Sequence, residues 1–182
     1  MIRSPVAVVV PLFLALATSS LEAGQVSIKG VHLCCAACQG RAVKALEGLK
    51  GVSKKSVDRN AKVISFLAAD EKAVATGIAA LAKSGFYGTA THQKKPVKFP
   101  DSGARRGARS DKVTLIGVHL CCDACVVGAQ VAMQNIKGLT AIEIDRDTRT
   151  LRLIGKAISH ADAVTALYKG GFYGRLPVAK KK

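Results

Sequence analysis

One segment of this chain is written twice, and the repetition constrains the fold more than any other feature. Residues 26–35 read Val-Ser-Ile-Lys-Gly-Val-His-Leu-Cys-Cys, and residues 113–122 read Val-Thr-Leu-Ile-Gly-Val-His-Leu-Cys-Cys. After a one-residue deletion, the sequence Gly-Phe-Tyr-Gly at 85–88 returns at 171–174, so the correspondence covers nearly the whole of each half. The chain is therefore a duplication, and we expect two modules of the same fold.

The hydrophobic period changes in a fixed order along the first copy. Alternation from Val26 to Ile28 predicts a strand, and apolar residues at helical spacing after the cysteines predict a helix that ends at Gly51. The runs 52–58 and 62–68 flank the turn sequence Asp-Arg-Asn, which predicts a hairpin. The second copy repeats this order.

A second helix and a short last strand complete each copy. Asp70 and Ser159 are predicted N-caps of the second helices, and the last strands are expected after Gly88 and Gly174. The order βαββαβ predicts an α+β protein with two ferredoxin-like sandwiches in tandem.

The N-terminal residues have the pattern of a secretory signal peptide. Arg3 supplies the positive end, residues 6–17 are apolar, and residues 18–23 are more polar and end in Ala23. The apolar run is shorter than the roughly 20 residues of a membrane-spanning helix. We expect cleavage after Ala23 and a periplasmic or secreted protein with no membrane span after removal of the signal.

The rest of the chain then divides into two modules and their connection. Residues 24–92 form the first module, 93–112 a basic flexible linker, 113–179 the second module, and 180–182 a Lys tail. A linker of this composition lets the modules tumble separately or face one another.

The formal net charge is +16, which raises the question of nucleic acid as a partner. The Gly-Phe-Tyr-Gly sequence is similar to an RNA-recognition signature, but that signature belongs on the third strand, whereas this sequence follows the second helix. We expect no nucleic acid partner. The sequence also shows no acid–base pair or phosphate-binding loop, so we do not expect an enzyme.

The six cysteines all lie where the first strand of each copy meets the first helix. Cys35 and Cys38, like Cys122 and Cys125, are three residues apart, so their sulfurs can converge at a helix N-terminus. The helix dipole there stabilises thiolates. Thiolates without fixed carboxylates favour soft ions such as Cu(I) over Mg(II) or Ca(II).

These motifs resemble those of the heavy-metal-associated (HMA) domain family, which includes copper chaperones and periplasmic mercury-binding proteins. The family carries Met-x-Cys-x-x-Cys and a Gly-aromatic loop, and here Leu33 and Leu120 stand where the family has Met. The resemblance implies that Phe86 and Phe172 pack near the metal loop. It also implies four metal ligands, which are Cys35, Cys38, Cys122 and Cys125.

Cys34 and Cys121 are additional thiols where the family usually has Thr, Ser or His. They could serve as auxiliary ligands if the chain leaves the strand at Leu33, which would allow a trigonal Cu(I) site. His32 and His119 could complete a Cys₃His zinc site, although strand alternation favours positions in which they are exposed or cap the metal loop. His92 and His160 are expected to face solvent.

The function predicted from these residues is binding of Cu(I), or of Hg, Ag or Zn, for sequestration or transfer outside the cytoplasm. One ion is expected in each module, and a metal-transporting ATPase or other metal-handling protein is a candidate partner. The alternative is a thiol–disulfide redox protein that uses the Cys-x-x-Cys pairs, and a purely structural disulfide is the third interpretation.

Overall fold

The structure is a computed structural model that describes residues 23–178. Residues 1–22 of the predicted signal peptide and the Lys tail at 180–182 lie outside the described residues. The first module contains β1 (Gly24–Lys29), α1 (Ala36–Ala45), β2 (Val52–Asp58), β3 (Val63–Ala68), α2 (Glu71–Lys83), β4 (Thr89–His92) and β5 (Lys95–Val97). Its strands form one antiparallel sheet in the order β2-β3-β1-β4-β5.

The second module contains β6 (Arg109–Ile116), α3 (Asp123–Met133), β7 (Leu139–Asp145), β8 (Thr150–Ser159) and α4 (His160–Lys169). Its sheet is antiparallel with the order β6-β8-β7. Four helices and two antiparallel sheets in the described part of the chain confirm the predicted α+β class.

The last strand of the second module is shorter than predicted. Of the residues described after Gly174, up to residue 178, Arg175 alone pairs with β6, through an isolated bridge to Ile116. The N–H of Leu176 is donated instead to Ser102 O at 2.8 Å. Pro177 has no N–H to donate, so the strand cannot extend.

The predicted caps of the second helices are confirmed. The Asp70 carboxylate accepts a hydrogen bond from the Ala73 N–H at 2.7 Å, and Ser159 Oγ accepts one from the Asp162 N–H at 3.3 Å. Each cap satisfies a backbone donor that the first helical turn leaves free. The helices therefore begin where the sequence predicts.

The helices pack against one face of each sheet, and small residues set how closely they approach. In α2, Gly77 lies directly on the ring of Phe66 from β3, where a Cβ would stand 2.5 Å from the ring. Phe66 is 1% exposed. The buried side chains of both modules form one continuous hydrophobic cluster.

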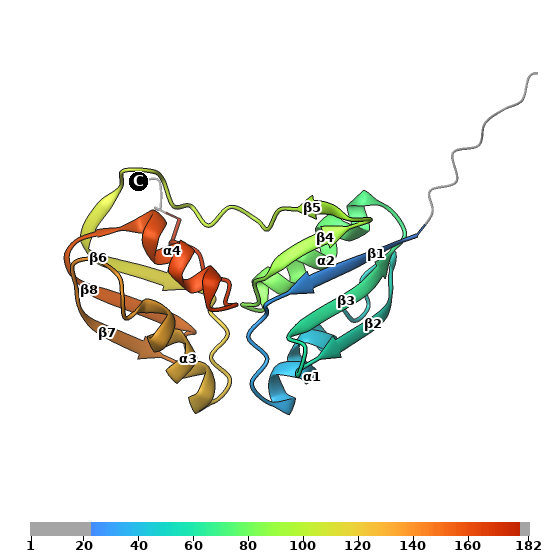
Figure 1. The fold of residues 1–182 in the computed structure, drawn as a ribbon, viewed down its shortest axis with the longest axis horizontal. Helices are drawn as coiled ribbons and strands as arrows, with labels where there is room; N and C mark the ends of the chain where they lie inside the picture. Colours follow the sequence, from blue (N-terminus) through green and yellow to red (C-terminus); the bar gives the residue numbers. More distant parts are fainter. Residues whose placement is uncertain (1–22, 179–182) are drawn as a thin grey trace, which may run out of the picture.

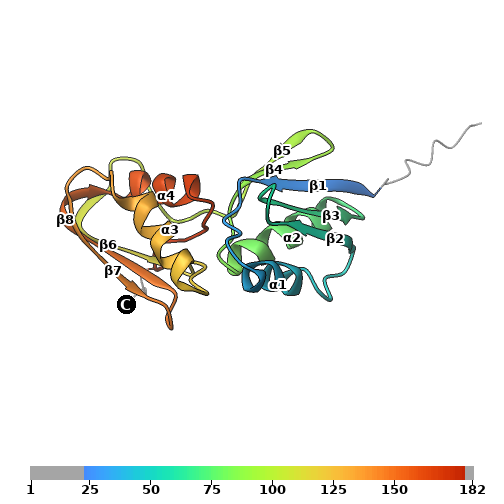
Figure 2. The ribbon, with the colours of Figure 1, turned by 60° about the horizontal axis from the view of Figure 1, so that its bottom comes forward.

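The two modules lie side by side, and the chain between them passes along one edge of the pair (Figure 1). In this view α3 and α4 lie in front of their sheet, whereas α2 lies behind its sheet. Turning the molecule keeps the modules in contact near the start of α1 and the end of α4 (Figure 2). Among residues 23–178, no helix combines the length and apolar character needed to cross a membrane.

The Gly-Phe-Tyr-Gly loops, residues 85–88 and 171–174, join the modules around an approximate twofold axis. Phe86 and Phe172 form an antiparallel bridge across the contact. The tyrosine N–H of each loop donates to the carbonyl of the first glycine of the other loop, at 3.2 and 2.8 Å. The same sequence thus pairs with its own copy.

The first glycine of each loop permits this contact. A Cβ on Gly85 would stand 2.3 Å from the backbone nitrogen of His119, and one on Gly171 would stand 2.4 Å from that of His32. Both glycines have positive φ, +88° and +82°. Any side chain here would collide with the cysteine-bearing loop of the other module.

The segment predicted as a flexible linker, 93–112, carries regular structure and packs on the modules. It contains β5 and the start of β6. Phe99 stands 4.7 Å from Tyr87 of the first module and 6.2 Å from Tyr173 of the second, between ring centroids. Tyr87 also stacks on Tyr168 at 3.8 Å. These rings bind the segment to both modules.

Candidate metal centre

The paired cysteines of each motif lie at the N-terminus of a helix, as predicted. Cys35 and Cys122 are the N-cap residues of α1 and α3 and have extended backbones. Cys38 and Cys125 follow in the first turn and are fully buried. A helix N-terminus favours thiolate, because its free N–H groups and the helix dipole stabilise negative charge.

The additional cysteines have left the strand conformation, which lets their side chains turn toward the pairs. Both first strands end several residues before the cysteines. Cys34 Sγ lies 3.5 Å from Cys38 Sγ, and Cys121 Sγ lies 3.6 Å from Cys125 Sγ. Leu33 and Leu120, the residues in place of the family Met, are buried beneath the loops.

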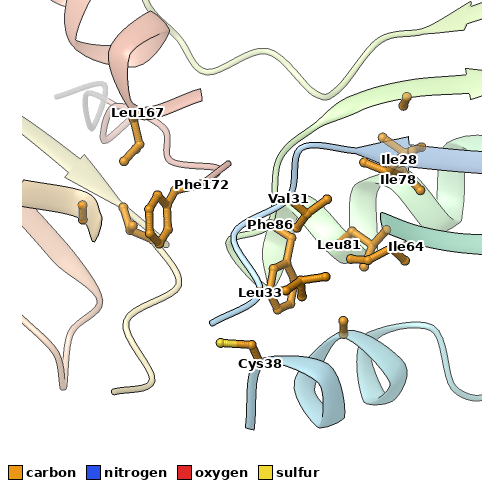
Figure 3. Close-up of a cluster of buried hydrophobic side chains, with 14 of the residues drawn as sticks. Ile28, Val31, Leu33, Cys38, Ile64, Ile78, Leu81, Phe86, Leu167 and Phe172 are labelled. Atoms are coloured by element: carbon orange, nitrogen blue, oxygen red, sulfur yellow. The ribbon is translucent and has the colours of Figure 1, made fainter. Parts of the chain in front are cut away.

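The structure brings the cysteines of both modules together. Cys34 Sγ lies 3.4 Å from the sulfurs of Cys122 and of Cys125, and Cys38 Sγ lies 3.5 Å from that of Cys121. The sulfur of Cys38 points from α1 toward the second module (Figure 3). We call the whole set the cysteine cluster, and its members are Cys34, Cys35, Cys38, Cys121, Cys122 and Cys125. All of these thiols are free.

Each Gly-Phe-Tyr-Gly loop packs near the cysteine-bearing loop of the opposite module. The ring of Phe86 lies 4.4 Å from that of His119, and the ring of Phe172 stacks on His32 at 4.2 Å, between centroids. Because these contacts are reciprocal, the histidines cover the cysteine cluster from two sides.

The histidines contribute nitrogen donors to the cluster. Three groups of donor atoms lie within 4.8 Å of one another: Cys38, His119, Cys121 and Cys125; His32, Cys34 and Cys125; and Cys34, Cys35 and Cys122. His119 Nε2 lies 3.3 Å from Cys38 Sγ. Burial lowers the pKa of His32, which keeps the ring neutral and available as a ligand.

The other histidines lie outside the cluster. The expectation that His92 faces solvent is wrong, because its ring is buried and its Nδ1 lies 3.0 Å from a Glu71 carboxylate oxygen. His160 is half-buried, with Nε2 2.8 Å from Ser110 Oγ. Both rings take part in local packing.

Contacts among the thiols lower the pKa values of some cysteines and raise those of others. The neighbouring Cys125 thiol, with His119, holds the pKa of Cys38 well below its usual range, and the same contact raises the pKa of Cys125. Burial raises the pKa of Cys121 to about 12. Burial acts the same way on Cys122, but the Cys125 N–H and the thiol neighbours outweigh it and lower its pKa to about 7. The cluster thus carries some thiolate at neutral pH, and metal must displace the remaining protons.

Two arginines of the second module donate hydrogen bonds to its cysteine-bearing loop, and the sequence pattern did not predict this role. Arg149 donates to the carbonyl of Gly117 at 2.7 Å and, across the module contact, to that of Lys83 at 3.2 Å. Arg146 donates to the Cys121 carbonyl at 3.2 Å. The sequence signal that was available is their place in the turn of the predicted second hairpin, between β7 and β8.

An open cavity of about 860 Å³ between the modules borders the cluster at Cys121. Ala37 and Arg41 line it from the first module, and Cys121 and Arg146 from the second. Cys34 is exposed, whereas Cys38 and Cys125 are buried. The sulfur of Cys34 is therefore more accessible from solvent than those of Cys38 and Cys125.

Comparison with known proteins adds no assignment. The chain matches no protein-family model, and the search of curated proteins found no match. What the site can do therefore rests on its own donor set: a cysteine and histidine cluster that could hold a metal ion.

Proposed function

We propose that the cysteine cluster binds soft thiophilic metal ions, with Cu(I) as the first candidate and Hg, Ag and Zn as alternatives. The observation that carries the proposal is the convergence of the two cysteine motifs on one point, supported by two histidines. None of the donor groups found among residues 23–178 contains a carboxylate. Thiolate and imidazole donors select Cu(I) and related soft ions over hard cations.

The proposal extends to the family and the role. The strand order β2-β3-β1-β4 with two helices on one face supports a ferredoxin-like fold for the first module, and the cysteine positions support membership of the HMA family. The protein would sequester metal, or transfer it to a metal-transporting ATPase or another metal-handling protein, outside the cytoplasm and without catalysis. The exposed Cys34 supports transfer, because a partner thiol can reach it.

The test is anaerobic titration of residues 24–182 with Cu(I) against a chromogenic Cu(I) chelator. The control is the quadruple variant C35S/C38S/C122S/C125S. We expect the wild type to withdraw copper from the chelator and the variant to lose at least tenfold in affinity. Equal copper binding by both proteins would refute the proposal.

The same preparation tests the redox alternative. Free Cys-x-x-Cys thiols at a helix N-terminus also suit thiol–disulfide exchange. We expect the metal-free protein to show no catalytic turnover of a model disulfide. Turnover that is lost in Cys38→Ser would favour the redox function instead.

A further inference from the structure

We infer that the cysteine cluster is one shared site for up to four Cu(I) ions bridged by thiolates, rather than two sites of one ion each. This inference rests on the proposed function and specifies its site. Ten sulfur pairs in the cluster lie between 3.4 and 3.9 Å apart. More of these pairs join the two modules than lie within one.

The sulfur contacts define four triangular faces, each with three mutually close sulfurs. The faces are Cys34-Cys38-Cys125, Cys34-Cys122-Cys125, Cys38-Cys121-Cys125 and Cys35-Cys38-Cys121. Every face takes sulfurs from both modules. The approximate twofold axis exchanges the faces in pairs, because it exchanges equivalent cysteines. Three-sulfur coordination in this arrangement therefore requires both modules.

The faces have the right size for a trigonal thiolate site. The centre of a triangle with these edges lies about 2.1 Å from each sulfur, and a metal–thiolate bond is about 2.3 Å long, so an ion sits slightly off the plane. Cu(I) accepts low coordination by soft sulfur donors. Each face can hold one Cu(I) ion without movement of the backbone.

Because neighbouring faces share cysteines, the ions they hold would form one polynuclear centre. Cys38 and Cys125 each belong to three faces, and Cys34 and Cys121 each belong to two. These thiolates would bridge neighbouring ions. Six thiolates and four Cu(I) ions give a product with a net charge of −2, and each thiol that is still protonated releases its proton on binding. Arg149, which holds the loop at Gly117, supplies positive charge near it, whereas Arg146 is paired with the Asp123 carboxylate at 2.8 Å.

A single tetrahedral ion is the competing arrangement. No four sulfurs of the cluster are all within contact of one another, and the one four-donor group found in the described residues adds His119 to three cysteines. That group would suit one Zn(II) ion. It leaves Cys34, Cys35 and Cys122 without a role, whereas the four faces use every thiol.

Two double variants with the same number of thiols distinguish the arrangements. Every face contains Cys34 or Cys121, so C34S/C121S removes all four faces but keeps both Cys-x-x-Cys pairs. C35S/C122S breaks both pairs but keeps the two faces built on Cys38 and Cys125. Circular dichroism of the metal-free proteins checks that both variants fold.

The experiment loads residues 24–182 anaerobically with Cu(I) supplied as its acetonitrile complex. Native mass spectrometry counts the ions, and X-ray absorption counts sulfur and copper neighbours. We expect four ions in the wild type, with three sulfurs per copper and a copper–copper distance. We expect two bridged ions in C35S/C122S, and in C34S/C121S two isolated ions with two sulfurs each.

Other results would overturn the shared centre. Two isolated ions in the wild type, retained in C34S/C121S and lost in C35S/C122S, would establish one site per module and leave the proposed function intact. A single ion lost in His119→Ala would establish the tetrahedral site. Absence of Cu(I) binding in all three proteins would refute the proposed function together with the inference.

Discussion

Replacing Gly85 by alanine should weaken the docking of the two modules without unfolding either one. A left-handed backbone costs an alanine about 1–2 kcal/mol wherever it occurs. At Gly85 the new Cβ would also lie 2.3 Å from the His119 nitrogen and 2.7 Å from the Gly117 carbonyl oxygen, so the loop must withdraw from the other module.

The size of the effect follows from the contacts that this withdrawal breaks. The two backbone hydrogen bonds between the Gly-Phe-Tyr-Gly loops, at 2.8 and 3.2 Å, contribute about 1 kcal/mol each. Their loss corresponds to a fall of about 30-fold in the docking equilibrium. Because every three-sulfur face needs both modules, Cu(I) affinity should fall by a similar factor.

Gly48→Ala is the matched control. Gly48 has φ +68°, in the same region as the +88° of Gly85, and no contact of its Cβ position within 4 Å is found. Small-angle X-ray scattering should show an expanded particle for Gly85→Ala and an unchanged one for Gly48→Ala, and chelator competition should show the loss of Cu(I) affinity in Gly85→Ala alone. If the two variants behave alike in both measurements, backbone strain rather than module contact explains the effect, and the reasoning fails.

Two further predictions concern the metal-free protein. The rate of alkylation of Cys122 by iodoacetamide should have its midpoint near pH 7 and fall at lower pH, because protonation at its pKa of about 7 removes the reactive thiolate. Cys121, with a pKa of about 12, should react slowly at every pH tested. Peptide mass mapping measures the alkylation of both cysteines. In urea titrations, Gly77→Ala should lower the free energy of unfolding by about 1–3 kcal/mol, because its Cβ would overlap the Phe66 ring. Gly40→Ala, in open space on α1, should raise the free energy of unfolding by up to about 1 kcal/mol. Equal midpoints for the two cysteines, or the same sign for the two glycines, would contradict these assignments.

The periodicity of the sequence predicts the elements of each module closely. The predicted hairpin 52–58 with 62–68 corresponds to β2 and β3 almost residue for residue, because alternation and turn chemistry are local signals. Strand β5 was not predicted, since Lys95-Pro96-Val97 has no apolar alternation and forms only by pairing with β4.

The joining of the two cysteine motifs could not be derived from periodicity. It depends on Gly85 and Gly171, each of which lies against the backbone of the other module. Contacts of this kind produce no hydrophobic period in the sequence of either loop. The matched extra thiols, Cys34 and Cys121, were the available signal. Their assignment as auxiliary ligands stays a prediction, but the structure places both within contact of the pairs.

The packed connection between the modules has a consequence for how the paired loops behave on dilution. Two halves on one chain meet at an effective concentration of about a millimolar or more, whatever the amount of protein present. Phe99 and Ser102 shorten the connection further by binding it to the modules. Pairing is therefore a first-order event within one molecule, and a module from another chain would have to approach that concentration to compete.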